Sequence, residues 1–169
     1  MKIYKDIFNQ EQKDFLEDIF KYEKTPFYLA THAVHANDQA HHFVHHVIHR
    51  DRPNEDNSTL TPPLKKLLYD ISDKINLNLE CIYRCALNIT FNFGLVNKCL
   101  SHVDHPFAHR QVLIYLNDSD GDTVFLNEDN TETKIKPEAY KIIVAKDTQH
   151  YQFFPTKGIR KVLIYTINV

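Results

Sequence analysis

Two side chains that commonly bind divalent metals stand two positions apart in the segment SHVDHP. They are His102 and Asp104. On extended backbone, residues i and i+2 point to the same side, so this imidazole and this carboxylate converge on one point. A third ligand is expected from a later segment, and His150 is the only histidine after His109. Two imidazoles and one carboxylate bind Fe(II) on one face and leave three positions open.

A cation is expected close to such a metal. Arg160 lies ten positions after His150 and begins the last strand-like segment, RKVLIYTINV. If Arg160 faces inward, burial demands an anionic partner, and a guanidinium binds a carboxylate through two parallel hydrogen bonds. Lys161 is the alternative for the same task. Tyr115 either donates a phenol hydrogen bond to the same carboxylate that Arg160 would bind, or only packs in the core.

The same residues also allow interpretations without a metal. His102 and Asp104 would suit a loop and a turn, and His150 would suit a hydrogen-bonded core position. Two further histidines follow the HVD segment closely and are alternative ligands, namely His105 and His109. Of these three histidines, only His102 stands two residues before an aspartate.

The elements that must position these residues form two groups. Apolar side chains recur at helical spacing over residues 10–22, after Asn9 as N-cap, and over 59–75, where prolines occupy the first turn. From residue 80 onward, short segments rich in β-branched and aromatic residues alternate with turns, giving about eight strands. We therefore expect a mainly β protein, a double-stranded β-helix (jelly roll) supported by two N-terminal α-helices.

Length and composition limit the class of protein. The 169 residues suit one domain spanning 1–169, with helical support in 1–78 and the jelly-roll core in 79–169. A net charge of -2 argues against a nucleic acid or membrane partner. There is no long apolar run and no apolar signal core, so we expect a cytoplasmic protein. Three glycines exclude Gly-rich phosphate loops, and three cysteines without a CxxC pair suggest reduced thiols.

Two other segments have alternative interpretations. Seven of the 11 histidines lie between His32 and His49. Their i,i+4 pairs could chelate zinc on a helix, but HHFVHHVIHR also has the pattern of a half-buried strand whose histidines lie on the surface or at the mouth of a site. The segment DSDGDT, residues 118–123, predicts a hairpin turn and lacks the glutamate of a calcium loop.

A family resemblance rests on the order of these motifs. HVDHP is followed by the strand LIYLN with Tyr115, then by His150 at the start of a strand and by Arg160 at the start of the next. This order resembles the prolyl 4-hydroxylase-like branch of the 2-oxoglutarate/Fe(II) oxygenase superfamily over roughly residues 81–169. The small size and compact loops resemble virus-encoded members. Val162 stands where many members carry serine.

The resemblance implies a 2-oxoglutarate- and Fe(II)-dependent dioxygenase, acting as a hydroxylase. His102, Asp104 and His150 would hold Fe(II), and Arg160 with Tyr115 would bind 2-oxoglutarate. With O2 as the second co-substrate, such enzymes release succinate and CO2. The expected prime substrate is a peptidyl proline or another side chain of a peptide or protein, and next a small molecule. The alternative is a non-catalytic metal-binding jelly-roll module that recognises a partner through the same cavity.

Overall fold

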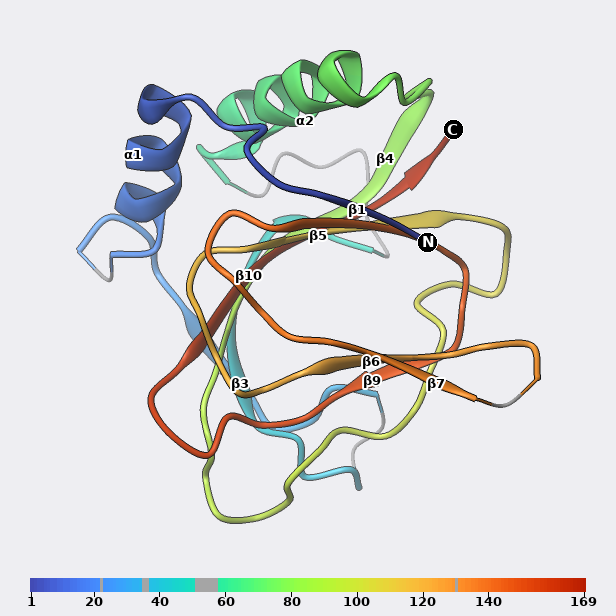
Figure 1. The fold of residues 1–169 in the computed structure, drawn as a ribbon. Coiled ribbons are helices and arrows are strands. Elements are labelled where there is room, and N and C mark those ends of the chain that lie inside the picture. Colours follow the sequence, from blue (N-terminus) through green and yellow to red (C-terminus); the bar gives the residue numbers. More distant parts are fainter. Residues whose placement is uncertain (22, 35–36, 51–57, 130) are drawn as a thin grey trace.

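Two antiparallel sheets face each other, and two helices cover the outer side of the larger sheet (Figure 1). The computed structural model describes residues 1–21, 23–34, 37–50, 58–129 and 131–169. Two predictions fall partly outside these residues: the end of the first helix at Tyr22 and the part of the histidine-rich segment at position 35.

The larger sheet has seven strands in the spatial order β1-β8-β5-β10-β4-β3-β2. Their bounds are β1 Lys2–Tyr4, β2 Tyr28–Ala30, β3 His42–Ile48, β4 Cys81–Thr90, β5 Arg110–Tyr115, β8 Ile142–Lys146 and β10 Arg160–Asn168. The smaller sheet has the order β7-β6-β9. Its strands are β6 Thr123–Leu126, β7 Glu132–Ile135 and β9 His150–Gln152. The predicted mainly β fold is therefore confirmed.

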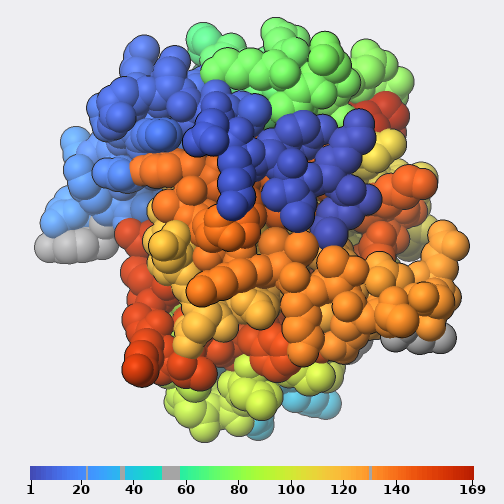
Figure 2. Space-filling view, viewed as in Figure 1, coloured from blue at the N-terminus to red at the C-terminus, as the bar shows by residue number. Residues whose placement is uncertain are grey.

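The two predicted helices are present as α1 (Gln10–Ile19) and α2 (Thr61–Ile75). Asn9 caps α1 as predicted: its side chain accepts from the backbone N–H of Gln12, and the Gln12 side chain accepts from the Asn9 N–H. In α2, Tyr165 of β10 donates to the carbonyl of Leu64 over 2.9 Å, which ties the helix to the sheet. Together the N-terminal segment and both helices form one continuous cap (Figure 2). Neither helix of the described chain has the length and apolar character needed to span a membrane.

The N-terminal part of the chain contributes strands as well as helices. β1, β2 and β3 all belong to the larger sheet, and Val44 of β3 pairs with Asn88 of β4. The expected division between helical support in 1–78 and a jelly-roll core in 79–169 therefore does not separate helices from sheets. From residue 79 onward the described chain has seven strands instead of about eight. β3 itself was difficult to recognise because histidines on both of its faces obscure the alternation of apolar and polar residues that marks a strand.

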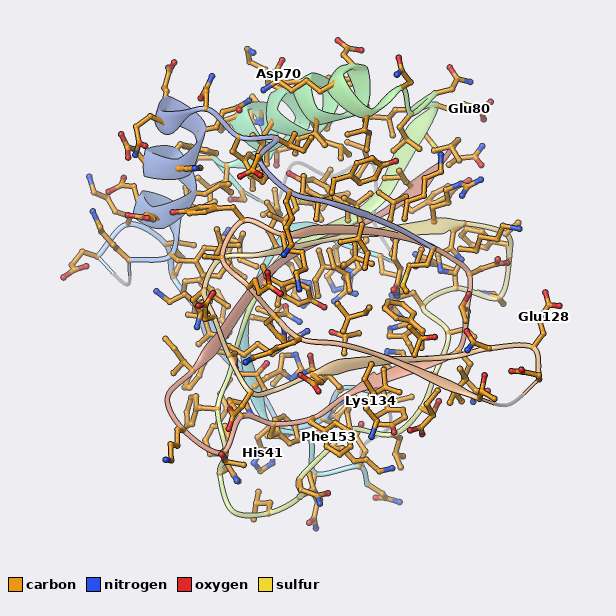
Figure 3. All side chains as sticks on the ribbon, viewed as in Figure 1. His41, Asp70, Glu80, Glu128, Lys134 and Phe153 are labelled. Carbon is orange, nitrogen blue, oxygen red and sulfur yellow. The ribbon has the colours of Figure 1, made fainter. Side chains whose placement is uncertain are left out.

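Alternation along β5 and β10 divides the interior into two cores. One core lies between the larger sheet and the helices, and these two strands contribute Val112, Ile114, Leu163 and Tyr165 to it. The other lies between the two sheets, with Leu113, Tyr115 and Val162, and Figure 3 shows side chains filling that space. The inward face of β10 is thus the one predicted to carry Arg160.

The prediction of a hairpin turn within residues 118–123 is wrong. This segment joins β5 of the larger sheet to β6 of the smaller sheet, so the chain crosses between sheets there. The turn residues are the same for both kinds of connection, and the sequence pattern does not distinguish them. A Cβ at Gly121 would lie 2.8 Å from the carbonyl oxygen of Phe153 and 3.2 Å from Cδ of Arg160. Glycine therefore allows this loop to pack directly against Arg160.

Candidate metal centre

Three side chains of the types that bind metals converge between the two sheets. The candidate ligand atoms of His102, Asp104 and His150 all lie within 4.8 Å of one another. Within the described residues this is the one group of three or more His, Cys, Asp or Glu side chains so arranged. The structure thus brings together the three residues selected from the sequence.

Backbone pairing fixes the two histidines beside each other. The N–H of each donates to the carbonyl of the other, with both N···O distances 2.9 Å. A second bridge, between Lys98 and Phe153, aligns the segment before His102 with β9. As a result the rings of His102 and His150 have centroids 4.5 Å apart. The pairing extends the smaller sheet and makes the ligand geometry a property of the backbone.

Each histidine is oriented by a backbone carbonyl. Nδ1 of His102 lies 3.0 Å from the carbonyl oxygen of Leu100, and Nδ1 of His150 lies 3.0 Å from that of Thr148. With the proton on Nδ1, the Nε2 lone pair of each ring is available for a metal. Burial lowers the pKa of His150 to about 4. His150 is therefore neutral at physiological pH, which is the state that ligates metals.

Asp104 is the ionised member of the group. Its Oδ1 accepts from Arg50 Nη2 over 2.9 Å and from Arg84 Nη1 over 3.3 Å. Burial alone would raise the pKa of this carboxyl, but Arg84, His150 and Arg50 outweigh it and hold the pKa well below its usual range. The site thus offers one permanent negative charge to a cation.

Gln111 of β5 shows that the ligand atoms already converge. Its Nε2 donates to Asp104 Oδ2 and lies 3.0 Å from Nε2 of His150. An N–H donor and a metal ion both bind to lone pairs of oxygen and nitrogen. The lone pairs of Asp104 Oδ2 and His150 Nε2 that Gln111 contacts are therefore positioned to bind one metal ion together. The Gln111 Oε1 is buried and has no hydrogen-bond partner. A donor set of two imidazoles and one carboxylate fits Fe(II).

Arg160 lines the same cavity of about 80 Å³ as the three candidate ligands. It is 2% exposed. Its Nη2 donates to Thr123 Oγ1 over 2.8 Å and its Nη1 to Gln152 Oε1, while its Nε is buried without a partner. No carboxylate of the described chain forms an ion pair with it. Arg160 thus faces inward, which is the condition under which an anionic partner is expected, and the described residues supply no counterion for its charge.

The two other candidates for the 2-oxoglutarate site lie differently. The Nζ of Lys161 is 6.0 Å from the ring centroid of Phe20, on the helix side of the sheet. Tyr115 is fully buried and does not line the cavity. Its hydroxyl is 2.6 Å from Thr123 Oγ1, and the Arg160 guanidinium lies 5.4 Å from its ring centroid. Tyr115 therefore supports Thr123 and Arg160 from behind the cavity wall, and its direct contact with a ligand stays a prediction.

The alternative ligands His105 and His109 are engaged elsewhere. His105 Nε2 is 2.7 Å from Thr166 Oγ1, and His109 Nδ1 is 2.8 Å from the carbonyl oxygen of Phe107. Burial, together with Arg50, lowers the pKa of His105 to about 4. Neither histidine belongs to the group of converging ligand atoms.

The histidine-rich segment forms β3, so its i,i+4 histidines do not converge as they would on a helix. His45 is bonded to the carbonyl of Pro26 and the hydroxyl of Ser58, at 2.8 and 2.7 Å. His42 is buried and lines the cavity, and burial lowers its pKa. One neutral imidazole of this segment therefore faces the site.

Several cavity residues were not selected from the sequence, namely Arg50, Arg84, Asn88, Gln111, Thr123 and Gln152. A signal exists for two of them. Arg84 and Asn88 alternate with apolar residues in the strand CIYRCALNIT. A charge at the centre of a strand whose other face is buried suggests an inward-facing polar site. Arg50 offered no such signal, because it directly precedes a polar loop.

The comparisons with known proteins concern the fold. No protein-family model matches the sequence, and no curated protein matches it either. Solved structures do match. An oxidoreductase of the 2OG-Fe(II) oxygenase family from Burkholderia pseudomallei has a TM-score of 0.78 and 18% identity, covering 97% of this chain and 83% of that one.

Two further matches carry different activities in their descriptions. A prolyl-4-hydroxylase from Pseudomonas putida has a TM-score of 0.64 and 12% identity, over 99% of this chain and 91% of that one. A non-heme alpha ketoglutarate dependent epimerase from nogalamycin biosynthesis has a TM-score of 0.68 and 8% identity, over 97% and 75%. At these identities the likeness shows a shared fold. The predicted double-stranded β-helix with helical support is thus confirmed.

Proposed function

We propose that this protein is a 2-oxoglutarate- and Fe(II)-dependent dioxygenase of the prolyl 4-hydroxylase-like branch, hydroxylating a peptidyl proline or another side chain. One observation carries the proposal. Two imidazoles and an ionised carboxylate share a cavity with Arg160, a buried arginine that forms no ion pair with any carboxylate of the described chain. A metal-chelating dianion matches both features, because it satisfies a cation with open positions and a separate guanidinium. The fold of the matched oxygenases supports the same assignment.

Each residue then has a defined task. His102, Asp104 and His150 hold iron through one face, which leaves the other face to co-substrates. Arg160, with Thr123, binds the far carboxylate of 2-oxoglutarate and sets its orientation. Bound iron would supply the oxidising chemistry, in which O2 would convert 2-oxoglutarate to succinate and CO2, with one oxygen atom entering succinate and the other the substrate.

The reaction of the co-substrates tests this proposal before the prime substrate is known. Purified protein is supplied with Fe(II), 2-oxoglutarate and O2, and succinate is measured over time. We expect slow, iron-dependent succinate formation that is absent in His150→Ala and present in the control variant His105→Ala. Iron binding without any consumption of 2-oxoglutarate would instead favour the non-catalytic metal-binding module.

Candidate substrates are then compared by their effect on that rate. Proline-containing peptides are expected to accelerate succinate formation and to gain one oxygen atom, as detected by mass spectrometry. A substrate that accelerates succinate formation without gaining oxygen would indicate another oxidative outcome, such as the epimerisation named for one matched structure. That result would support the assignment to the oxygenases and exclude hydroxylation as the reaction of this protein.

A further inference from the structure

The end of the cavity away from Arg160 holds two more arginines. In the register of β4 with β10, Arg160 pairs with Thr90 whereas Arg84 pairs with Thr166. The six-residue step along β4 from 84 to 90 separates the backbone of these two positions by roughly 20 Å at the rise of a strand. The side chains of Arg84 and Arg50 line the same cavity as Arg160 but start from this second end.

These two arginines share a single carboxylate oxygen. Both donate to Oδ1 of Asp104, at 3.3 Å from Arg84 and 2.9 Å from Arg50. The Arg84 side chain is only 12% exposed, and within the described chain this is its one hydrogen bond. One negative charge therefore faces two guanidinium groups. If Asp104 also ligates a metal dication, less of its charge remains for them.

Among the described residues, Asp104 is the one carboxylate that forms an ion pair with Arg84 or Arg50. Asp38 is the second buried carboxylate, and it accepts from the backbone N–H groups of Ala33, Val34 and Ala40. Asn88 lines the cavity between the two ends, and its Oδ1 has no hydrogen-bond partner. The described wall at the Arg84 end thus carries more positive than negative charge.

Burial and then Arg84 lower the pKa of His46 to about 4. Burial also lowers the pKa of His42, where Arg84 again acts in the same direction. These two imidazoles therefore add no negative or positive charge near Arg84 at neutral pH. An anion entering here meets two guanidinium groups whose charge Asp104 balances only in part.

We propose that the prime substrate carries a carboxylate that binds between Arg84 and Arg50, and that the carbon oxidised lies within a few bonds of that carboxylate. Among the described residues, Asp104 offers one negative charge to two guanidinium groups. The charge left over equals that of one carboxylate, whereas a phosphate monoester would bring nearly two negative charges. Because Arg84 contacts Asp104 itself, an acid group bound there places its neighbouring carbons beside the metal centre. This inference rests on the proposed oxygenase function and names its substrate class.

Matched pairs of acids and amides test the inference by binding, without turnover. The protein is loaded with Zn(II) and 2-oxoglutarate, and ligand-observed NMR is recorded with small aliphatic and aromatic acids and their amides. A second arm uses capped peptides containing Asp or Glu with their Asn or Gln counterparts, and it distinguishes a free acid from an acidic side chain. We expect acids to bind at least about tenfold more tightly than the amides, as for charge-assisted hydrogen bonds.

Three variants locate the binding. Arg84→Gln should remove most of the preference for acids, and Arg50→Gln, at a more exposed side chain, should weaken it by about threefold. Arg110→Gln, outside the cavity lining, should leave it unchanged. Zinc content of each variant is measured, and Arg50→Gln keeps the test valid if Arg84→Gln does not fold.

The inference is overturned if amides bind as well as acids, if no acid binds, or if acid binding depends on Arg160 and not on Arg84 or Arg50. A failure of the proposed function is recognised separately. In that case the iron-loaded wild-type protein would show no succinate formation, whatever the acid preference of the second end.

Discussion

The two ends of the cavity both contain buried arginine, but the protein gives each a different set of partners. Arg160 contacts the neutral side chains of Thr123 and Gln152, whereas Arg84 and Arg50 contact the carboxylate of Asp104. A buried charge without a counterion is costly, and a ligand that supplies the counterion recovers that cost. Among the described residues, the first end thus offers no carboxylate to its arginine, and the second offers one carboxylate to two guanidinium groups.

The largest effect is expected from the residues between these two ends. Replacing His150 with alanine removes a metal ligand, so we expect iron affinity to fall by at least about 100-fold, beyond the loss typical of supporting residues. Fe(II) or Co(II) binding is measured by calorimetry under argon. His105→Ala is the matched control, because His105 contacts Thr166 instead of the candidate ligands. Equal losses in both variants would remove His150 from the ligand set.

A smaller effect is expected at the Arg160 end. Arg160→Gln keeps a side chain that can bond Thr123 but removes the charge. We expect 2-oxoglutarate affinity to fall by about 10- to 100-fold, the equivalent of a charged hydrogen bond worth ~1.5–3 kcal/mol, while iron binding is retained. Lys161→Gln, on the opposite face of β10, should change the dissociation constant by less than about twofold. The reverse ranking would assign the co-substrate to Lys161.

A side chain added at Gly121 should weaken 2-oxoglutarate binding at Arg160 indirectly. The added Cβ in Gly121→Ala meets the backbone of Phe153 and the side chain of Arg160. We expect a loss of about 1–3 kcal/mol in the free energy of unfolding, together with weaker 2-oxoglutarate binding. Gly94 has a φ of 77° and open space around it. Gly94→Ala should therefore lower stability by about 1–2 kcal/mol and leave 2-oxoglutarate binding intact. This control distinguishes a general loss of stability from the displacement of Arg160 that is expected in Gly121→Ala.

The smallest effect is the pH dependence of the Arg84 end. His46 has its pKa lowered from 6.5 to about 4 by burial and Arg84, so between these values the unfolded chain binds more protons than the folded one. Stability of the metal-free protein should therefore fall as pH decreases from 6.5 towards 4. Chemical denaturation at pH 7 and pH 5 measures this slope. His46→Asn should reduce it, whereas His32→Asn, at an exposed position, should not; an unchanged slope in His46→Asn would contradict the assignment.

The sequence predicted the parts of this site that depend on local spacing. His102 and Asp104 are two residues apart on extended chain, and His150 and Arg160 begin strands, so periodicity was sufficient to select them. The partners of Asp104 depend on long-range pairing instead. Arg50 reaches the carboxylate across 54 positions of sequence, and no local pattern encodes that distance.

The same contrast applies to the fold. Helices α1 and α2 and the strands after residue 80 follow regular apolar periodicity. β3 was ambiguous because its sequence HFVHHVI places histidine on both faces. The crossing between sheets at residues 118–122 was mistaken for a hairpin because both use the same turn chemistry. Pairing between distant strands, not local propensity, decided both cases.

The visible spectrum of the anaerobic protein with Fe(II) and 2-oxoglutarate tests the central claim most directly. The claim is that His102, Asp104 and His150 hold iron while Arg160 holds the far carboxylate of 2-oxoglutarate. We predict a weak charge-transfer band that is lost in His150→Ala, displaced to higher 2-oxoglutarate concentrations in Arg160→Gln and unchanged in Lys161→Gln. Iron bound without this band, or a band independent of both His150 and Arg160, would contradict the account.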